Sequence, residues 1–445
     1  MTTSLSGMAS GLDTTSLINS LMQVESAPQT ALKTKVSTIT TSNSAYTTVN
    51  NKMKALLTAA QDLTNADTWK SAKATSSSPM VVATAATGAQ TGDMVFSVTK
   101  LAAGQRSTAA FAAADTPATT GNSIDLTIGT GDAAVTTSIA IDADANTPAG
   151  VAAAINKAGL NVRASVVTTD SGPVLQLSST KTGASNAFSV SGLTTDPATM
   201  TAGSDAQLTV GDPSAGGYTV SSGSNTFTGV MPGVTITASA LANNVTIGVH
   251  ADTDAIATKM QALVDAANGA LAQISVSAAS GSSSASGSAP SGGPLAGDYT
   301  VRQLSSQMLS AISNGKSGFG SFKQLGIELT QDGKLKFNKD DFLTAYSADP
   351  AKVQSAVSTG LAQSLQDVGK AATDSTTGTL MLKLQSGTSS VSRLNKEITG
   401  WDTKLALRKS ALQRQFTAME TAMSKVQSQS SWLSSNSSAS SSSSS

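Results

Sequence analysis

His250 is the only histidine of the chain, and the chain contains no cysteine. Usual zinc sites need several His or Cys ligands, and Ser-His or Cys-His catalysis needs a histidine beside its nucleophile. His250 follows a β-prone run at residues 245–249 and precedes a helical pattern. We therefore expect a surface residue at the end of a strand, with no metal site and no cofactor.

Three polar residues alternate as they do in a calcium-binding loop: Asp142, Asp144 and Asn146. Such a loop requires Gly at its sixth position, where Thr147 stands, and Glu at its twelfth, which is absent here. Turn and helix-capping residues in front of Pro148 explain the pattern better than a metal site does.

Two further patterns that could support catalysis are weak. Gly129-Thr130-Gly131 is followed by Asp132 instead of the helix start that a phosphate-binding loop needs, so we interpret it as a hairpin tip. Glycoside hydrolysis needs only two carboxylates, but no acidic pair stands out, and the aromatic residues that line sugar clefts make up only 4% of the chain. We predict that the protein is not an enzyme and has no catalytic residues.

Composition favours a soluble protein of several domains. The chain has 445 residues, and its 28 Lys and Arg balance its 28 Asp and Glu, so nothing attracts nucleic acid or an anionic membrane to the whole chain. No stretch approaches the ~20 apolar residues of a membrane helix. Residues 1–10 lack the pattern of a classical signal peptide, so we expect any export to use a route without a cleavable signal.

The chain begins with two helical patterns. Asp13 is a plausible N-cap, and Leu17, Leu21 and Val24 then form an apolar stripe at helical spacing. Pro28 should break or kink the helix near residue 27. A second helical pattern covers residues 29–67, about 55 Å at 1.5 Å per residue, and a helix of that length needs a partner along it.

The C-terminal run carries the strongest periodic signal. Its apolar row has a spacing of seven: Leu384, Val391, Ile398, Leu405, Leu412, Met419, Val426 and Leu433. Such a row predicts a long helix in a coiled coil or bundle. The companion row is broken by residues such as Arg408 and Gln415, so we expect another helix to complete the seam, with the N-terminal helix as the candidate.

Basic residues also gather in this run: Arg393, Lys396, Lys404, Arg408, Lys409, Arg414 and Lys425. A solvated helix face is the simplest interpretation. Contact with an acidic neighbouring subunit is the alternative.

Between these ends, short β-prone runs alternate with turn residues. The predicted fold class is a multidomain α+β protein, in which long N- and C-terminal helices form a coiled coil or helical bundle and antiparallel β-rich domains are inserted between them. The expected division is a helical leg (1–40), a helical domain (41–75 and 251–383, with a Ser/Gly loop at 277–294), a β-rich middle (76–250, nested as 76–195 and 196–250), a coiled-coil leg (384–433) and a disordered Ser tail (434–445).

An ordered set of motifs runs along the chain: the opening at residues 10–13 with the helix at 17–28, and then residues 74–77, 92–102, 126–129, 184–188, 229–237, 293–298, 325–327, 416–420 and 429–433. This ordered set resembles the flagellar filament-capping proteins, the hook-associated protein 2 family. The resemblance runs from about residue 5 to residue 433. The Ser/Gly stretch and the Ser tail depart from it.

The resemblance implies a structural cap at the distal end of the bacterial flagellar filament, which retains exported flagellin and promotes its folding and insertion. It implies a homo-oligomeric ring, a pentamer within a range of four to six subunits. Further implied partners are flagellin, the hook-filament junction protein and a cytosolic export chaperone, with no nucleic acid and no membrane. The implied location is the extracellular flagellum tip, reached by the flagellar type III route.

For contacts with other subunits or flagellin, we single out the apolar rows of the two terminal helices: Leu17, Leu21, Val24, Leu405, Leu412, Met419 and Val426.

Other functions stay open from the sequence. A surface adhesin for host glycan or mucin would need aromatic-lined sites in residues 80–250, where Phe96, Phe111, Phe188, Tyr218 and Phe227 are the candidates. A hook-filament junction protein, or flagellin itself, would share the helical ends. A secreted hydrolase is disfavoured because no catalytic constellation is present.

Overall fold

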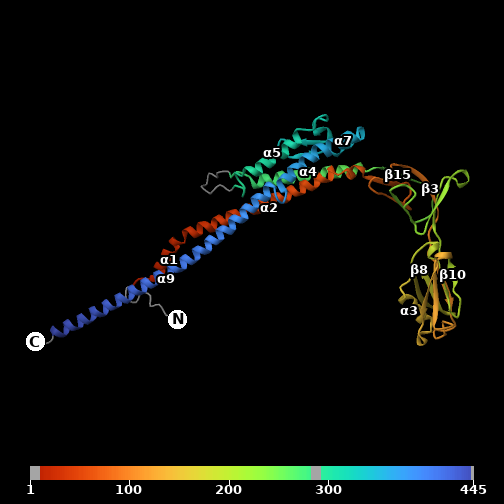
Figure 1. Cartoon of the computed structure of the whole chain (residues 1–445), viewed down its shortest axis with the longest axis horizontal. Coiled ribbons are helices and arrows are strands. Elements are labelled where there is room, and N and C mark those ends of the chain that lie inside the picture. The colour runs from red at the N-terminus through yellow and green to blue at the C-terminus, as the bar shows by residue number, and fades with distance from the viewer. Residues whose placement is uncertain (1–10, 282–291, 442–445) are drawn as a thin grey trace. The chain divides into compact units, whose positions relative to one another are not determined.

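A computed structural model of the chain describes residues 11–281 and 292–441 (Figure 1). The chain folds into two compact units. The helical unit comprises Met1–Thr64 and Lys259–Ser445, and the β unit comprises Asn65–Thr258. Residues 1–10, where the sequence predicts no cleavable signal, and residues 282–291 of the predicted Ser/Gly loop lie outside the described residues.

Two consecutive helices open the helical unit, α1 (Thr14–Glu25) and α2 (Ala27–Thr64). Asp13 caps α1, its Oδ1 accepting a hydrogen bond from the Ser16 amide at 2.9 Å, as the sequence predicts. The helix breaks at Ser26, two residues before Pro28. This break is the one predicted from the proline.

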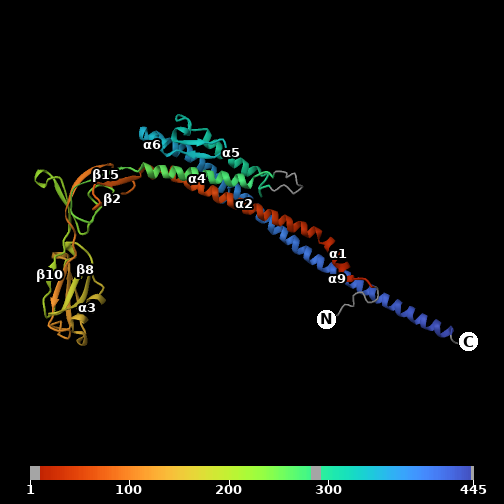
Figure 2. The ribbon, with the colours of Figure 1, turned by 180° about the vertical axis from the view of Figure 1, so that it is seen from behind.

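The helical unit is a bundle around α2. Its other main helices are α4 (Thr253–Ser277), α5 (Tyr299–Ser313), α8 (Gln363–Thr373) and α9 (Thr379–Ser441). Helix α2 packs on α8 and α9 (Figures 1 and 2). Its buried side chains recur at helical spacing and include Val49, Met53, Leu56 and Leu63. This apolar stripe fixes which face of α2 points into the bundle.

A small α+β segment completes the helical unit. Strands β16 (Ile327–Leu329) and β17 (Leu335–Phe337) form an antiparallel hairpin. The 3-10 helix η6 (Phe322–Leu325) precedes the hairpin. After the hairpin, Asn338 caps the first of the further helices. These are α6 (Lys339–Ala348), α7 (Pro350–Ala356) and the π-helix η7 (Val357–Ala362), which continues into α8.

The β unit contains two hydrophobic cores, which we call the outer and inner cores. The outer core lies between a five-stranded sheet of order β1-β15-β3-β11-β12 and a three-stranded sheet of order β13-β14-β2. Its strands are β1 (Ala72–Ser76), β2 (Val81–Ala85), β3 (Gly92–Lys100), β11 (Ala206–Val210), β12 (Tyr218–Ser222), β13 (Thr226–Phe227), β14 (Val234–Ala238) and β15 (Ala242–Ala251).

The inner core is built from the chain between β3 and β11. Sheets of order β10-β4-β8-β7 and β6-β5-β9 enclose it together with α3. Its elements are β4 (Arg106–Ala110), β5 (Ser123–Ile128), β6 (Val135–Ala140), α3 (Pro148–Lys157), β7 (Val162–Thr169), β8 (Gly172–Ser179), β9 (Phe188–Ser191) and β10 (Ala198–Thr201). Gly129, with φ of 100°, lies at the turn between β5 and β6, where the sequence predicts a hairpin tip.

Every strand pair in the described residues is antiparallel, and the long terminal helices pack together in the helical unit. The predicted fold class is therefore confirmed. The domain limits stay a prediction. The sequence places strand β3 in the first nested domain (76–195), but β3 pairs with β11 and β15 of the second (196–250). The reason is that the outer core is built from strands that precede the inner core in the sequence and strands that follow it.

Helix α9 continues further than the sequence predicts. We expect disorder from residue 434, but the helix runs to Ser441, and residues 442–445 lie outside the described residues. Serine has only a moderately unfavourable helix propensity, so an established helix can extend through a short serine run.

Candidate assembly surface on the terminal helices

The residues that could carry chemistry lie apart from one another. His250 is exposed near the end of β15, as predicted, with its Nε2 atom 3.9 Å from Oδ1 of Asp93. Within residues 11–281 and 292–441, no three His, Cys, Asp or Glu side chains gather closely enough to hold a metal ion. No described helix has the length and apolar character that crossing a membrane would require.

Asn146 of the calcium-like pattern has a structural role. Its Oδ1 accepts hydrogen bonds from the amides of Ala118 and Thr119, at 3.0 and 2.8 Å, and from the Thr119 hydroxyl at 3.0 Å. Thr147 caps α3 by accepting from the Gly150 amide at 3.1 Å. The side-chain oxygen that a calcium ion would need is therefore occupied by two backbone amides and a hydroxyl.

We predict that Asn146→Ala will destabilise the inner core by about 2 kcal/mol, because it leaves buried amides without their acceptor. Thermal unfolding followed by circular dichroism measures this loss, with Asp144→Ala as the exposed control. Adding calcium should leave the melting temperature of the native protein unchanged. A rise in that temperature with calcium would restore the metal-site interpretation.

The aromatic residues that a glycan site would need are mostly buried. Phe96, Phe111, Phe188 and Phe227 all belong to the two hydrophobic cores. Among the five candidates, only Tyr218 is exposed. One exposed ring does not form the aromatic platform that a sugar cleft requires, so the structure does not favour the adhesin alternative.

The terminal helices form a feature that we call the leg: residues 11–40 of α1 and α2, together with residues 391–435 of α9. Helices α1 and α2 run alongside α9 (Figures 1 and 2). Two polar contacts set the antiparallel register. Nε of Arg408 lies 2.8 Å from Oε1 of Glu25, and Nε2 of Gln29 donates to Oδ1 of Asp402 at 2.5 Å.

Apolar side chains fill the seam between the helices of the leg. Ile18 of α1 is buried, as are Leu394 and Leu412 of α9. Leu405 is partly buried one heptad before Leu412. The N-terminal helices therefore complete the seam of α9, as the sequence predicts.

The predicted contact residues divide into two groups. Leu405 and Leu412 lie in the seam inside the chain. The others are exposed large apolar side chains, with exposed fractions as follows: Leu17 48%, Leu21 44%, Val24 75%, Met419 37% and Val426 60%. These exposed residues form what we call the apolar rows of the leg, one on α1 and one on α9, available to a partner.

Sequence reasoning missed three residues of the leg. Ile18 and Gln29 bury against α9, and Met423 is exposed beside Met419 and Val426. Met423 lies four residues after Met419, a spacing that could have identified it. Gln29 offers no comparable signal, because its partner Asp402 is far away in the sequence.

A polar cluster joins three helices of the bundle above the leg. Oδ2 of Asp298 accepts a hydrogen bond from the Tyr46 hydroxyl of α2 and lies 3.3 Å from Nζ of Lys383 on α9. Its Oδ1 caps α5, accepting from the amides of Thr300 and Val301 at 2.7 and 3.3 Å. This carboxylate therefore ties α2, α5 and α9 together.

The cluster shifts the acidity of both groups. Burial acts to raise the pKa of Asp298, but the hydrogen bond from Tyr46, the charge of Lys383 and the two amide donors outweigh it, and the net pKa is lowered. Burial, followed by the hydrogen bond to Asp298 and its negative charge, raises the pKa of Tyr46 well above its ordinary value. Both shifts favour the form that makes the contact.

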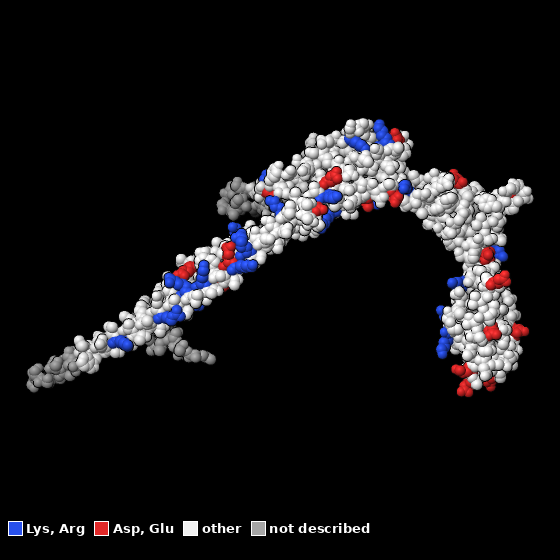
Figure 3. All heavy atoms as spheres, in the orientation of Figure 1, with Lys and Arg blue, Asp and Glu red and all other residues white. Residues whose placement is uncertain are grey.

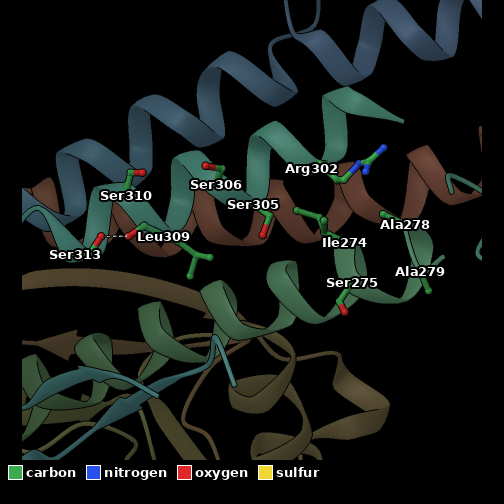
Figure 4. Close-up of a pocket in the computed structure, with 10 residues that line it drawn as sticks. All are labelled: Ile274, Ser275, Ala278, Ala279, Arg302, Ser305, Ser306, Leu309, Ser310 and Ser313. Carbon is green, nitrogen blue, oxygen red and sulfur yellow. Dashed lines mark hydrogen bonds between the residues drawn. The ribbon is translucent and has the colours of Figure 1, made fainter. Parts of the chain in front are cut away.

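A shallow groove of about 620 Å³ separates α4 from α5 (Figure 4). Its apolar lining comes from Ile274, Ala278, Ala279 and Leu309, and Arg302 is its single charged side chain. The remaining lining is serine. Such a lining offers no general base and no nucleophile paired with one, so the groove lacks the parts of an active site.

Comparison with protein families accounts for this architecture. A family described as "Flagellar hook-associated protein 2 C-terminus" matches residues 203–428, and its companion "Flagellar hook-associated protein 2 N-terminus" matches residues 10–105. The chain belongs to the flagellar hook-associated protein 2 family. The resemblance found in the sequence is thereby confirmed, and the two matches include most of both helical ends.

Members of the hook-associated protein 2 family align with nearly the whole chain. The B-type flagellar hook-associated protein 2 of Pseudomonas aeruginosa is 30% identical, over 93% of this chain and 92% of its own length. The Escherichia coli K12 flagellar hook-associated protein 2 is 27% identical over 96% of both chains. The crystal structure of the D1-D2-D3 domains of the flagellar cap protein FliD from Escherichia coli matches 77% of this chain and 99% of that chain, with 26% identity and a TM-score of 0.59.

Proposed function

We propose that this protein is a structural cap at the distal end of the bacterial flagellar filament. The observation that carries the proposal is the family match at both helical ends, together with a solved relative described as a flagellar cap protein. The nearly complete alignment with hook-associated protein 2 relatives supports a shared role for the whole chain.

In the proposed mechanism, several copies form a ring at the filament tip, a pentamer within a range of four to six subunits. The exposed apolar rows of the leg contact other subunits or the filament, because an exposed apolar row gains free energy when a partner covers it. The cap retains flagellin that emerges unfolded and promotes its folding and insertion. The Asp298 cluster supports this work by holding the base of the leg in a fixed bundle.

The proposed partners are flagellin, the hook-filament junction protein and a cytosolic export chaperone. The proposed location is extracellular, at the flagellum tip, with export by the flagellar type III route. The protein acts without turnover chemistry: we assign it no catalytic residue, no metal and no cofactor.

Deleting the gene tests the proposal. We expect the mutant to lose swimming in soft agar and to shed monomeric flagellin into the medium, because nothing retains the exported subunits. Complementation with the intact gene should restore both filaments and motility. Normal filaments in the deletion strain would contradict the cap function and bring a surface-binding role forward.

A further inference from the structure

The leg carries more positive charge than negative charge. Its two segments, residues 11–40 and 391–435, contain nine Lys and Arg against five Asp and Glu, although the whole chain is formally neutral. The basic residues are Lys33, Lys35, Arg393, Lys396, Lys404, Arg408, Lys409, Arg414 and Lys425, and the acidic residues are Asp13, Glu25, Glu397, Asp402 and Glu420.

Every acidic side chain of the leg is already engaged. Their contacts are Asp13 with the Ser16 amide, Glu25 with Arg408, Asp402 with Gln29 and Glu397 with Arg393, and Glu420 also has a partner. Two of these contacts, those of Glu25 and Asp402, bind α9 to the N-terminal helices. Four of the five carboxylates thus make contacts within the leg itself.

Most of the lysines and arginines of the leg have no carboxylate partner among the described residues. Within the described part of the chain, only Arg393 and Arg408 of the nine have a carboxylate partner. Arg414 donates to the Ser410 hydroxyl, and Nζ of Lys404 lies 5.2 Å from the centre of the Trp401 ring. Lys396, Lys404, Lys409 and Lys425 are exposed and therefore present charge to the solvent. Figure 3 shows that Lys and Arg side chains gather along the leg, with some Asp and Glu side chains among them.

We propose that these four lysines of α9 recognise an acidic surface on the flagellin subunits at the filament end. The proposal rests on the proposed function and specifies the chemistry of the partner. Lys425 stands one residue before Val426 on α9, so positive charge and the apolar row of α9 occupy the same stretch of this helix. A surface that combines apolar contact with charge of one sign fits a protein partner of complementary composition.

A solvated helix face is the simpler explanation, and the charge balance of the leg argues against it. A surface adapted only to solubility carries both signs without a large excess of one. Here nine cations stand against five carboxylates, four of these carboxylates already make contacts within the leg, and the four lysines have no carboxylate partner in the described residues. Charge complementarity therefore selects an acidic partner, and it would raise the rate of docking.

The test measures binding of the full-length protein to filaments reconstituted from purified flagellin of the same bacterium, at 50 and 300 mM NaCl. The variant changes the four lysines together: Lys396→Gln, Lys404→Gln, Lys409→Gln and Lys425→Gln. The matched control removes the same charge from exposed lysines of the helical unit outside the leg: Lys52→Gln, Lys54→Gln, Lys334→Gln and Lys370→Gln. Glutamine keeps helix propensity close to that of lysine, and far-UV circular dichroism verifies the fold.

We expect the native protein and the control to bind about tenfold more weakly at the higher salt concentration, because screening weakens exposed ion pairs. The leg variant should bind about tenfold more weakly at 50 mM and change little with salt. Equal binding by variant and native protein, an equal loss in the control, or tighter binding of the native protein to DNA or anionic vesicles would overturn the proposal. Native protein that binds filaments without salt dependence contradicts this inference alone, whereas no filament binding at either concentration contradicts the cap function as well.

Discussion

Replacing Met419 and Val426 together with aspartate is expected to abolish swimming while leaving the protein folded. Both side chains lie on the apolar row of α9 and are substantially exposed, so no intrachain core depends on them. Burying such side chains against a partner contributes about 1.5–3 kcal/mol each, and a buried unpaired carboxylate reverses that gain. Swimming in soft agar and flagellin in the culture medium are the measurements, and we expect motility to fall to the level of the deletion strain.

The matched control places the same charges elsewhere on the same helix. Thr421→Asp and Ser428→Asp have the same spacing of seven but occupy exposed polar positions away from the apolar row. We expect this control to swim and the melting temperatures of both variants to stay within about 3 °C of the native value. Equal motility of the two variants would show that the apolar row has no part in assembly.

Asp298→Asn should produce the largest loss of stability among the polar substitutions that the structure suggests. The carboxylate accepts from Tyr46, Thr300 and Val301 and faces Lys383, and an amide cannot satisfy the same set. Because hydrogen bonds to charged groups contribute more than neutral ones, we expect a loss of about 2–3 kcal/mol in urea unfolding at pH 7. Tyr46→Phe removes one donor and should cost about 1 kcal/mol.

The same cluster predicts how stability varies with pH. The pKa of Asp298 is lower in the folded state than in the unfolded state, so its contribution is present above the unfolded value of about 3.9 and is lost as pH falls through the folded value. The native protein should therefore lose more stability than Asp298→Asn between pH 5 and pH 2.5. Parallel curves for the two proteins would contradict the assigned role of this carboxylate.

Local signals predicted much of the helical architecture. The row with a spacing of seven identified α9, Pro28 marked the break between α1 and α2, and Asp13 marked the start of α1. Each signal acts within a few residues of the structure that it determines. The broken companion row of α9 also indicated that another helix completes its seam, because Arg408 there pairs with Glu25.

Contacts between residues that are far apart in the sequence could not be predicted from such local signals. Leu17 and Leu21 have the same spacing as a core stripe, yet Ile18 is the side chain that faces α9. A periodic pattern shows that a helix has an apolar face, but a second helix decides which of two neighbouring faces is buried. Likewise, Tyr46 and Asp298 form a hydrogen bond although they are 252 residues apart in the sequence, and neither residue type predicts that contact.

The β unit shows the same limit at the level of topology. Its short strands were visible as β-prone runs, but the insertion of the inner core between β3 and β11 follows from pairings such as Leu208 with Val98. Strand register across more than a hundred residues has no local signature. The nesting of two cores was therefore predictable only as a general arrangement.

Locating the protein on intact flagella tests the central claim most directly. An epitope inserted into the Ser/Gly loop at 277–294, detected by immunogold labelling in the electron microscope, reports where the protein lies on each filament. We predict a single cluster of label at the distal end of each filament, in a strain whose motility is normal. Label along the filament, at its base or on the cell surface would contradict the assignment of this protein as the filament cap.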